Sequence, residues 1–187
     1  MSDRIAVART NAESHIYMDL HPCLCGCATF DRTSSVIDTP DGLCSHYHGT
    51  CEDCGEPREF TFLLPESPYE IDTDADLFGG EGTSELLDPG EWMLVADRFA
   101  DAVPESAPAA GPDRAEARSL LATAFAAVTE AIAFADPHTE TVPSAALRSE
   151  RGREIYEREP ERFSLIRLEN VQSAYRELLI EYGGRPD

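Results

Sequence analysis

The sequence predicts an α+β fold, in which a small antiparallel β module precedes a helical C-terminal part. Stretches with strand-like alternation lie before residue 65, whereas stretches with helical spacing lie after residue 90. Because the two kinds of element are segregated along the chain, a doubly wound sheet is not expected. The 187 residues divide into three predicted parts: a β module over 1–65, an acidic connecting region over 66–112 and a helical region over 113–187.

Four short stretches of the β module are predicted to be strands. "HIYMDL" alternates, with Ile16, Met18 and Leu20 on one side, and "PREFTFLLP" places Phe60 and Phe62 on one face. "TFDRTSSVID" and "LCSHYHG" contain the β-branched and aromatic residues that are typical of strands. We expect these stretches to pair as an antiparallel sheet.

The rest of the chain shows the spacing of amphipathic helices. A short helix is predicted near 91–103, where apolar residues recur at helical intervals after "DPG". A long helix is predicted to start with Asp113 as its N-cap and to end before Pro137. Two more are expected, one over 149–159 and one along "EPERFSLIRLENVQSAYRELLIEYGG", where the glycines end the helix.

The cysteines gather in two clusters that predict a metal site. Each cluster ends in Cys-Gly, "CLCG" beginning at Cys23 and "CEDCG" at Cys51. In a metal knuckle the residue after the second cysteine often needs a positive φ, which glycine adopts without strain. In a reducing cytosol, clustered cysteines are more often metal ligands than disulfides. We therefore predict one structural zinc ion, held by four thiolates: Cys23, Cys25, Cys51 and Cys54.

Four further residues could take part in this site. Cys27 could replace Cys23 through "CGC", and His48 lies three residues before Cys51. Cys44 and His46 are also close in the sequence, although a small buried cysteine and surface histidines on a strand explain these residues better. Because four sulfurs already complete a structural zinc site, the prediction keeps the four-cysteine set.

The stretch 20–65, "LHPCLCGCATF…GTCEDCGEPREFTFLLPE", resembles zinc-ribbon modules. The resemblance implies an N-terminal antiparallel zinc-ribbon-like β module, although its C-x-C half is tighter than the usual C-x-x-C. "LLDPGEWMLVADRFA" and the stretch from "VPSAALRSERG" to "SAYRELL" are similar to small actinobacterial proteins, some of them encoded beside polymorphic toxins. That similarity implies an immunity protein that neutralises a cognate toxin.

The charge of the chain restricts its partners. The net charge is −21, every basic residue is an arginine, and residues 66–113 alone hold thirteen acids against one arginine. Such a chain repels nucleic acid and anionic lipid and attracts basic proteins. The sequence has no apolar run of transmembrane length and no secretory-signal pattern, so a cytoplasmic location without membrane association is expected.

No catalytic motif is recognisable, and the protein is expected not to be an enzyme. "DTDADLFGGEGT" begins like a calcium loop, but Leu77 stands where glycine is required and Thr83 where glutamate is required. The hypothesis is an acidic zinc-binding protein that binds and occludes a basic protein partner, and a zinc ribbon associated with nucleic acid or transcription machinery is the alternative. The expected partner-binding residues lie in the acidic region: Tyr69, Asp72, Asp74, Asp76, Leu77 and Phe78.

Overall fold

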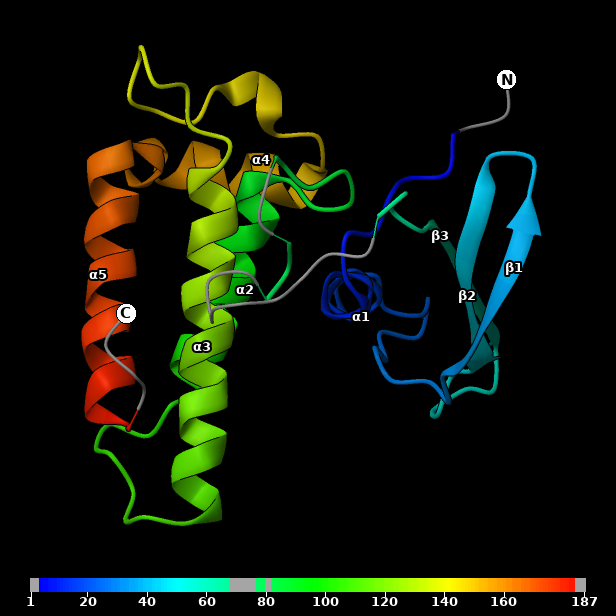
Figure 1. The fold of residues 1–187 in the computed structure, drawn as a ribbon, viewed down its shortest axis with the longest axis horizontal. Coiled ribbons are helices and arrows are strands. Elements are labelled where there is room, and N and C mark those ends of the chain that lie inside the picture. The colour runs from blue at the N-terminus through cyan, green and yellow to red at the C-terminus, as the bar shows by residue number, and fades with distance from the viewer. Residues whose placement is uncertain (1–3, 68–76, 80–81, 184–187) are drawn as a thin grey trace. The chain divides into compact units, whose positions relative to one another are not determined.

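A computed structural model describes residues 4–67, 77–79 and 82–183 of the chain. Within these ranges the fold contains a three-stranded antiparallel sheet and five α-helices, so the predicted α+β class is confirmed (Figure 1). None of the helices in these ranges is long and apolar enough to cross a membrane. The chain divides into two compact units: unit 1 holds 4–67 and 84–86, and unit 2 holds 77–79, 82–83 and 87–183 among the described residues.

The sheet belongs to unit 1 and has the strand order β1-β2-β3. Its strands are β1 (Thr33–Thr39), β2 (Gly42–Thr50) and β3 (Pro57–Leu63). Each strand pairs antiparallel with the next, with Ile37 opposite Cys44 and Tyr47 opposite Phe60. Three of the four predicted strands are therefore confirmed, and β1 and β2 form the hairpin that separates the two cysteine clusters.

The fourth predicted strand, "HIYMDL", is wrong, because this stretch is the second half of helix α1 (Asn11–Leu20). Thr10 is the N-cap of this helix, and its hydroxyl accepts a hydrogen bond from the backbone N–H of Glu13 at 3.1 Å. The Glu13 carboxylate in turn accepts a hydrogen bond from the backbone N–H of Arg9 at 2.7 Å. This local capping stabilises a helix in spite of the alternating apolar residues that follow it.

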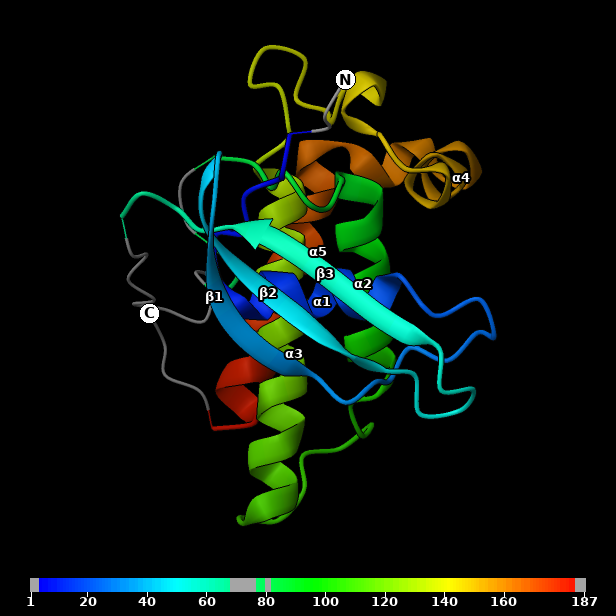
Figure 2. The ribbon, with the colours of Figure 1, turned by 90° about the vertical axis from the view of Figure 1, so that its right-hand side faces the viewer.

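Helix α1 lies across one face of the sheet (Figure 2). The core between helix and sheet contains Met18 from α1, Tyr47 from β2 and Phe62 from β3, together with Phe30 and Ala8. Edge-to-face contacts between aromatic rings, among them Tyr17 against Phe62 at 5.5 Å between centroids, add to the buried apolar area. Unit 1 thus has its own hydrophobic core.

Unit 2 is helical, which agrees with the helices expected near 91–103 and after residue 113. Its α-helices are α2 (Pro89–Asp101), α3 (Pro112–Ile132), α4 (Glu150–Arg158) and α5 (Leu165–Glu181), and two 3-10 turns are η2 (Ser144–Ala146) and η3 (Pro160–Phe163). Helix α3 packs against both α2 and α5 (Figure 1). The predicted N-cap of α3 is wrong: Gly111 caps it, Pro112 opens its first turn, and Asp113 lies within that turn.

Two helices of unit 2, α2 and α4, are joined by the buried carboxylate of Asp88, which is 1% exposed. Asp88 is the N-cap of α2, and its Oδ1 accepts a hydrogen bond from the backbone N–H of Glu91 at 3.0 Å. Its Oδ2 accepts three more, from the backbone N–H of Arg148 at 2.9 Å and from the N–H and hydroxyl of Ser149 at 2.7 and 2.8 Å. Because Ser149 is the N-cap of α4, one carboxylate fixes the start of both helices.

Candidate metal centre

Two loops of unit 1 carry the cysteine clusters. Cys23 and Cys25 lie in the connection between α1 and β1, and Cys51 and Cys54 lie in the turn that joins β2 to β3. The sulfur of Cys23 lies 3.6 Å from that of Cys54, and the sulfur of Cys25 lies 3.6 Å from that of Cys51. The structure therefore brings the four cysteines together from two separate segments of the chain.

The spacing of the four sulfurs fits a tetrahedral metal ion. All four lie within 4.8 Å of one another, and no disulfide joins any of the six cysteines. A zinc ion with Zn–S bonds of 2.3 Å and tetrahedral angles requires S···S separations of about 3.8 Å. A disulfide would require about 2.05 Å. The 3.6 Å separations fit such a tetrahedral site and are too long for a disulfide.

The backbone of each loop turns in the way that the Cys-Gly sequences predict. Gly26 and Gly55 both have positive φ, 94° and 74°, so a residue with a side chain would be strained at either position. The N–H of Gly26 donates to the carbonyl of Cys23 at 2.7 Å, and the N–H of Gly55 donates to the carbonyl of Cys51 at 2.9 Å. These matched turns point each pair of thiols toward the other pair.

Direct contacts hold the two loops next to each other. Phe30, which follows the first cysteine cluster, forms an antiparallel bridge with Cys51, and the backbone N–H of Glu52 donates to the carbonyl of Thr29 at 3.3 Å. From β3, Arg58 donates a hydrogen bond to the carbonyl of His21. Its guanidinium lies 5.3 Å from the centre of the Phe30 ring, which adds a cation–π contact. The fold of unit 1 therefore pre-positions the thiols.

The two thiols of the second loop, Cys51 and Cys54, differ in pKa. The backbone N–H of Cys54 donates to the sulfur of Cys51 and lowers the pKa of the Cys51 thiol to about 6. The backbone N–H of Glu56 lowers the pKa of Cys54, but hydrogen bonds with the thiols of Cys25, Cys23 and Cys51 outweigh it and raise that pKa to about 12. Binding of a divalent cation would displace the remaining protons and hold the four sulfurs as thiolates.

The four alternative ligands lie outside this cluster in the described part of the chain. Cys44 is fully buried in β2, where its sulfur lies 3.5 Å from the hydroxyl of Thr39. The sulfur of Cys27 lies 3.2 Å from the Thr29 hydroxyl. The rings of His46 and His48 stack on each other with 5.3 Å between centroids. The structure thus groups the four cysteines of the prediction and none of these four residues.

The predicted partner-binding segment is described only in part. Tyr69, Asp72, Asp74 and Asp76 lie outside the described residues. Leu77 is half-buried, and Phe78 is 1% exposed, with its ring 4.8 Å from that of Trp92 in α2. The expectation that Phe78 is an exposed anchor is therefore corrected: its ring is part of the interior of unit 2, where it packs at a tilt against the buried ring of Trp92.

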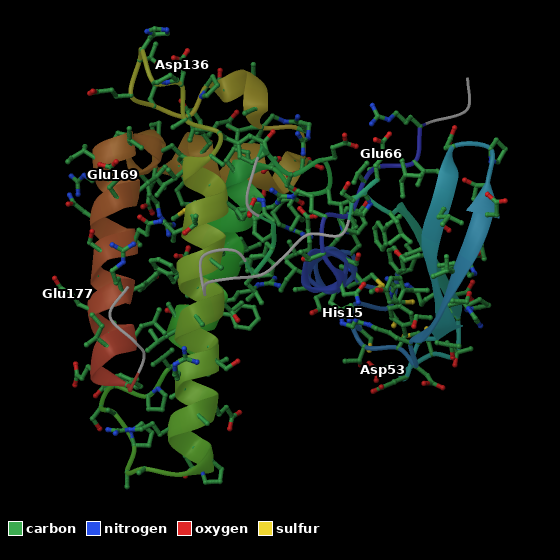
Figure 3. All side chains as sticks on the ribbon, viewed as in Figure 1. His15, Asp53, Glu66, Asp136, Glu169 and Glu177 are labelled. Carbon is green, nitrogen blue, oxygen red and sulfur yellow. The ribbon has the colours of Figure 1, made fainter. Side chains whose placement is uncertain are left out.

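The sequence interpretation missed the residues that surround the thiols. Leu24, between the first two ligands, is 104% exposed, and Glu52, Asp53 and Glu56 of the second loop are also exposed. Asp53 lies at the outer end of this loop (Figure 3). Within the described residues none of these three acids forms an ion pair. The exposure of these acids could have been predicted from "CEDCGE", because few side chains in and after a tight cysteine turn can point inward.

Comparisons with family models, with curated proteins and with solved structures give no match to this chain. The geometry of the four thiols and the charge around them are therefore the observations from which a function is inferred.

Proposed function

We propose that this chain is a non-enzymatic zinc-binding protein whose N-terminal part is a zinc-ribbon-like module and whose acidic surface binds a basic protein partner. The observation that carries the proposal is the set of four thiols within 4.8 Å of one another. Four protein ligands complete a tetrahedral zinc ion and leave no position for water or substrate. Such a site organises the loops around it and does not catalyse a reaction.

Zinc is the metal that suits this donor set best. Thiolate sulfur is a soft ligand, and a tetrahedral arrangement of four such sulfurs is typical of zinc in a site without inorganic sulfide. The hard cations calcium and magnesium require oxygen ligands in larger numbers. The positive φ of Gly26 and Gly55 supports the same assignment, because both turns follow the pattern of metal knuckles.

The surroundings of the proposed zinc ion support the binding of a basic partner. Leu24 is an apolar side chain in full contact with solvent, and the second cysteine loop carries the exposed carboxylates of Glu52, Asp53 and Glu56. An apolar anchor with an acidic rim is complementary to a basic surface that has an apolar pocket. The net charge of −21 adds long-range steering toward such a partner.

A cognate toxin is the partner that we propose, which makes the chain an immunity protein. The test begins with capture of partners from the native strain on the immobilised zinc-loaded protein, followed by mass spectrometry. Association of the identified protein is then measured at low and high salt. We expect a basic partner whose association rate falls steeply with salt, because screening removes the electrostatic steering.

Charge variants test which acids matter. The triple variant Glu52→Gln/Asp53→Asn/Glu56→Gln should slow association, as should the triple substitution of Asp72, Asp74 and Asp76 by asparagine. The matched control is Glu154→Gln/Glu157→Gln/Glu161→Gln, which neutralises three exposed acids of unit 2. Association that is independent of salt, or equally slowed by the control, would reject electrostatic recognition at these sites.

A further inference from the structure

The four thiols differ in their access to solvent. Cys25 and Cys54 are exposed, whereas Cys23 is 7% and Cys51 only 2% exposed. Each of the two short sulfur contacts of 3.6 Å joins one exposed thiol to one buried thiol: Cys25 to Cys51, and Cys54 to Cys23. The cluster therefore consists of two pairs, each with one exposed and one buried cysteine.

We propose that the metal site is also an oxidation site, at which a peroxide converts the four thiolates to two disulfides, Cys25–Cys51 and Cys23–Cys54, and releases the metal. The proposal rests on the metal site proposed above. It goes beyond it by assigning a reversible chemical modification to the same cysteines. Hydrogen peroxide is the smallest oxidant of this class and is the probe for the test.

Each pair of thiolates consumes one molecule of hydrogen peroxide. The exposed thiolate attacks hydrogen peroxide, its sulfur becomes a sulfenic acid, and hydroxide leaves. The buried thiolate of the pair attacks this sulfur, a disulfide bond forms, and a second hydroxide leaves. Two electrons pass from the two sulfurs to one peroxide. The zinc ion keeps its oxidation state and departs because it has lost its ligands.

The geometry favours these pairings over others. The sulfurs of each pair need to approach from 3.6 Å to about 2.05 Å, a change of about 1.5 Å. Cys44 is excluded because it is fully buried in β2. Cys27 is half-buried and lies two residues from Cys25, but its sulfur is hydrogen-bonded to Thr29 and lies outside the cluster.

Oxidation changes the acidic end of unit 1 in a specific way. A zinc ion with four thiolates carries a net charge of about −2, whereas two disulfides and a departed cation carry none. The loops stay joined, because each proposed disulfide links the first loop to the second. The modification therefore weakens the negative potential around Leu24 and replaces an exchangeable metal link by a covalent one.

The experiment uses the full chain, purified with zinc and with its zinc content measured before oxidation. Hydrogen peroxide is added, zinc release is followed with a chromogenic chelator, and disulfides are mapped by mass spectrometry after the free thiols are blocked. Trypsin places the two clusters on different peptides, and cleavage after Glu52 separates Cys51 from Cys54. Cys23 and Cys25 stay on one peptide, so fragmentation on either side of Leu24 in the mass spectrometer assigns the partner of each, and the swapped pairing would contradict the inference. We expect release of all bound zinc, the two named disulfides, and recovery of zinc binding after treatment with a thiol reductant.

Two variants serve as controls. Cys27→Ser and Cys44→Ser each remove a thiol outside the cluster, and both should release zinc at the same rate as the unaltered protein. Retention of zinc under peroxide, disulfides that include Cys27, or oxidation to sulfinic acid without a disulfide would each overturn the inference. Protein that contains no zinc before oxidation would instead contradict the metal site itself, so the two failures are distinguishable.

Discussion

Replacing Asp88 by alanine should destabilise unit 2 strongly, because one buried carboxylate accepts hydrogen bonds from the starts of two helices. The variant loses the N-cap of α2, which costs about 1 kcal/mol. It also leaves the backbone N–H groups of Arg148 and Ser149 without their acceptor. Each partly buried unpaired donor costs about 1 kcal/mol, the low end of the usual range. The expected loss in the free energy of unfolding is therefore about 3 kcal/mol.

Urea unfolding followed by helical circular dichroism measures this loss, since most helical residues lie in unit 2. With a slope of about 2 kcal/mol per molar urea, the midpoint should fall by about 1.5 M. The control is Asp113→Ala, which removes an exposed acid from the first turn of α3 and should cost about 0.3–1 kcal/mol through the helix dipole alone. Equal midpoints for the two variants would refute the claim that Asp88 joins α2 to α4.

Three further predictions follow from the same structure. Gly152→Ala should destabilise unit 2 by about 2 kcal/mol or more in the urea assay, because its new Cβ would lie 2.2 Å from Oδ1 of Asp88, and unchanged stability would contradict the close packing. Gly55→Ala should weaken zinc binding about tenfold in a chelator competition, since a φ of 74° costs a side-chain-bearing residue about 1–2 kcal/mol, and full affinity would show that the turn is not required. Zinc affinity should fall as the pH falls, because protons compete for the thiolates. The pKa of Cys51 is about 6 and that of Cys54 about 12, so zinc binding at neutral pH should release fewer than four protons. Calorimetry in buffers of different ionisation heat measures the number of protons released.

The thiol cluster could be predicted from the sequence because its signal is local. Each Cys-Gly ending specifies its own turn, and the positive φ of Gly26 and Gly55 confirms that expectation. The three strands of the sheet could also be predicted from the sequence, since their β-branched and aromatic residues match a half-buried pleated surface. The exposure of Leu24 and the pairing of one exposed with one buried sulfur depend on how two distant loops meet, which no local pattern specifies.

The errors of the sequence interpretation have identifiable physical causes. In α1, the alternation of Ile16, Met18 and Leu20 favoured a strand, whereas the capping pattern Thr10-x-x-Glu13 favoured a helix. The stretch is a helix, with Thr10 as its N-cap. The short helix was expected to begin after "DPG", near residue 91, yet Asp88 caps α2 and Pro89 begins it. Phe78 was expected on the surface because its segment is acidic. Phe78 is buried because it packs against Trp92, and the periodicity of apolar residues does not reveal a contact between residues this far apart in the sequence.

The zinc content of the purified protein and of two cysteine variants tests the central claim most directly. Elemental analysis should find one zinc ion per chain in the unaltered protein and in Cys44→Ser, whose thiol lies outside the cluster. Cys51→Ser should contain little or none, because it removes one of the four sulfurs. A protein without zinc even after refolding in its presence, or equal loss of zinc in both variants, would contradict a site built from Cys23, Cys25, Cys51 and Cys54.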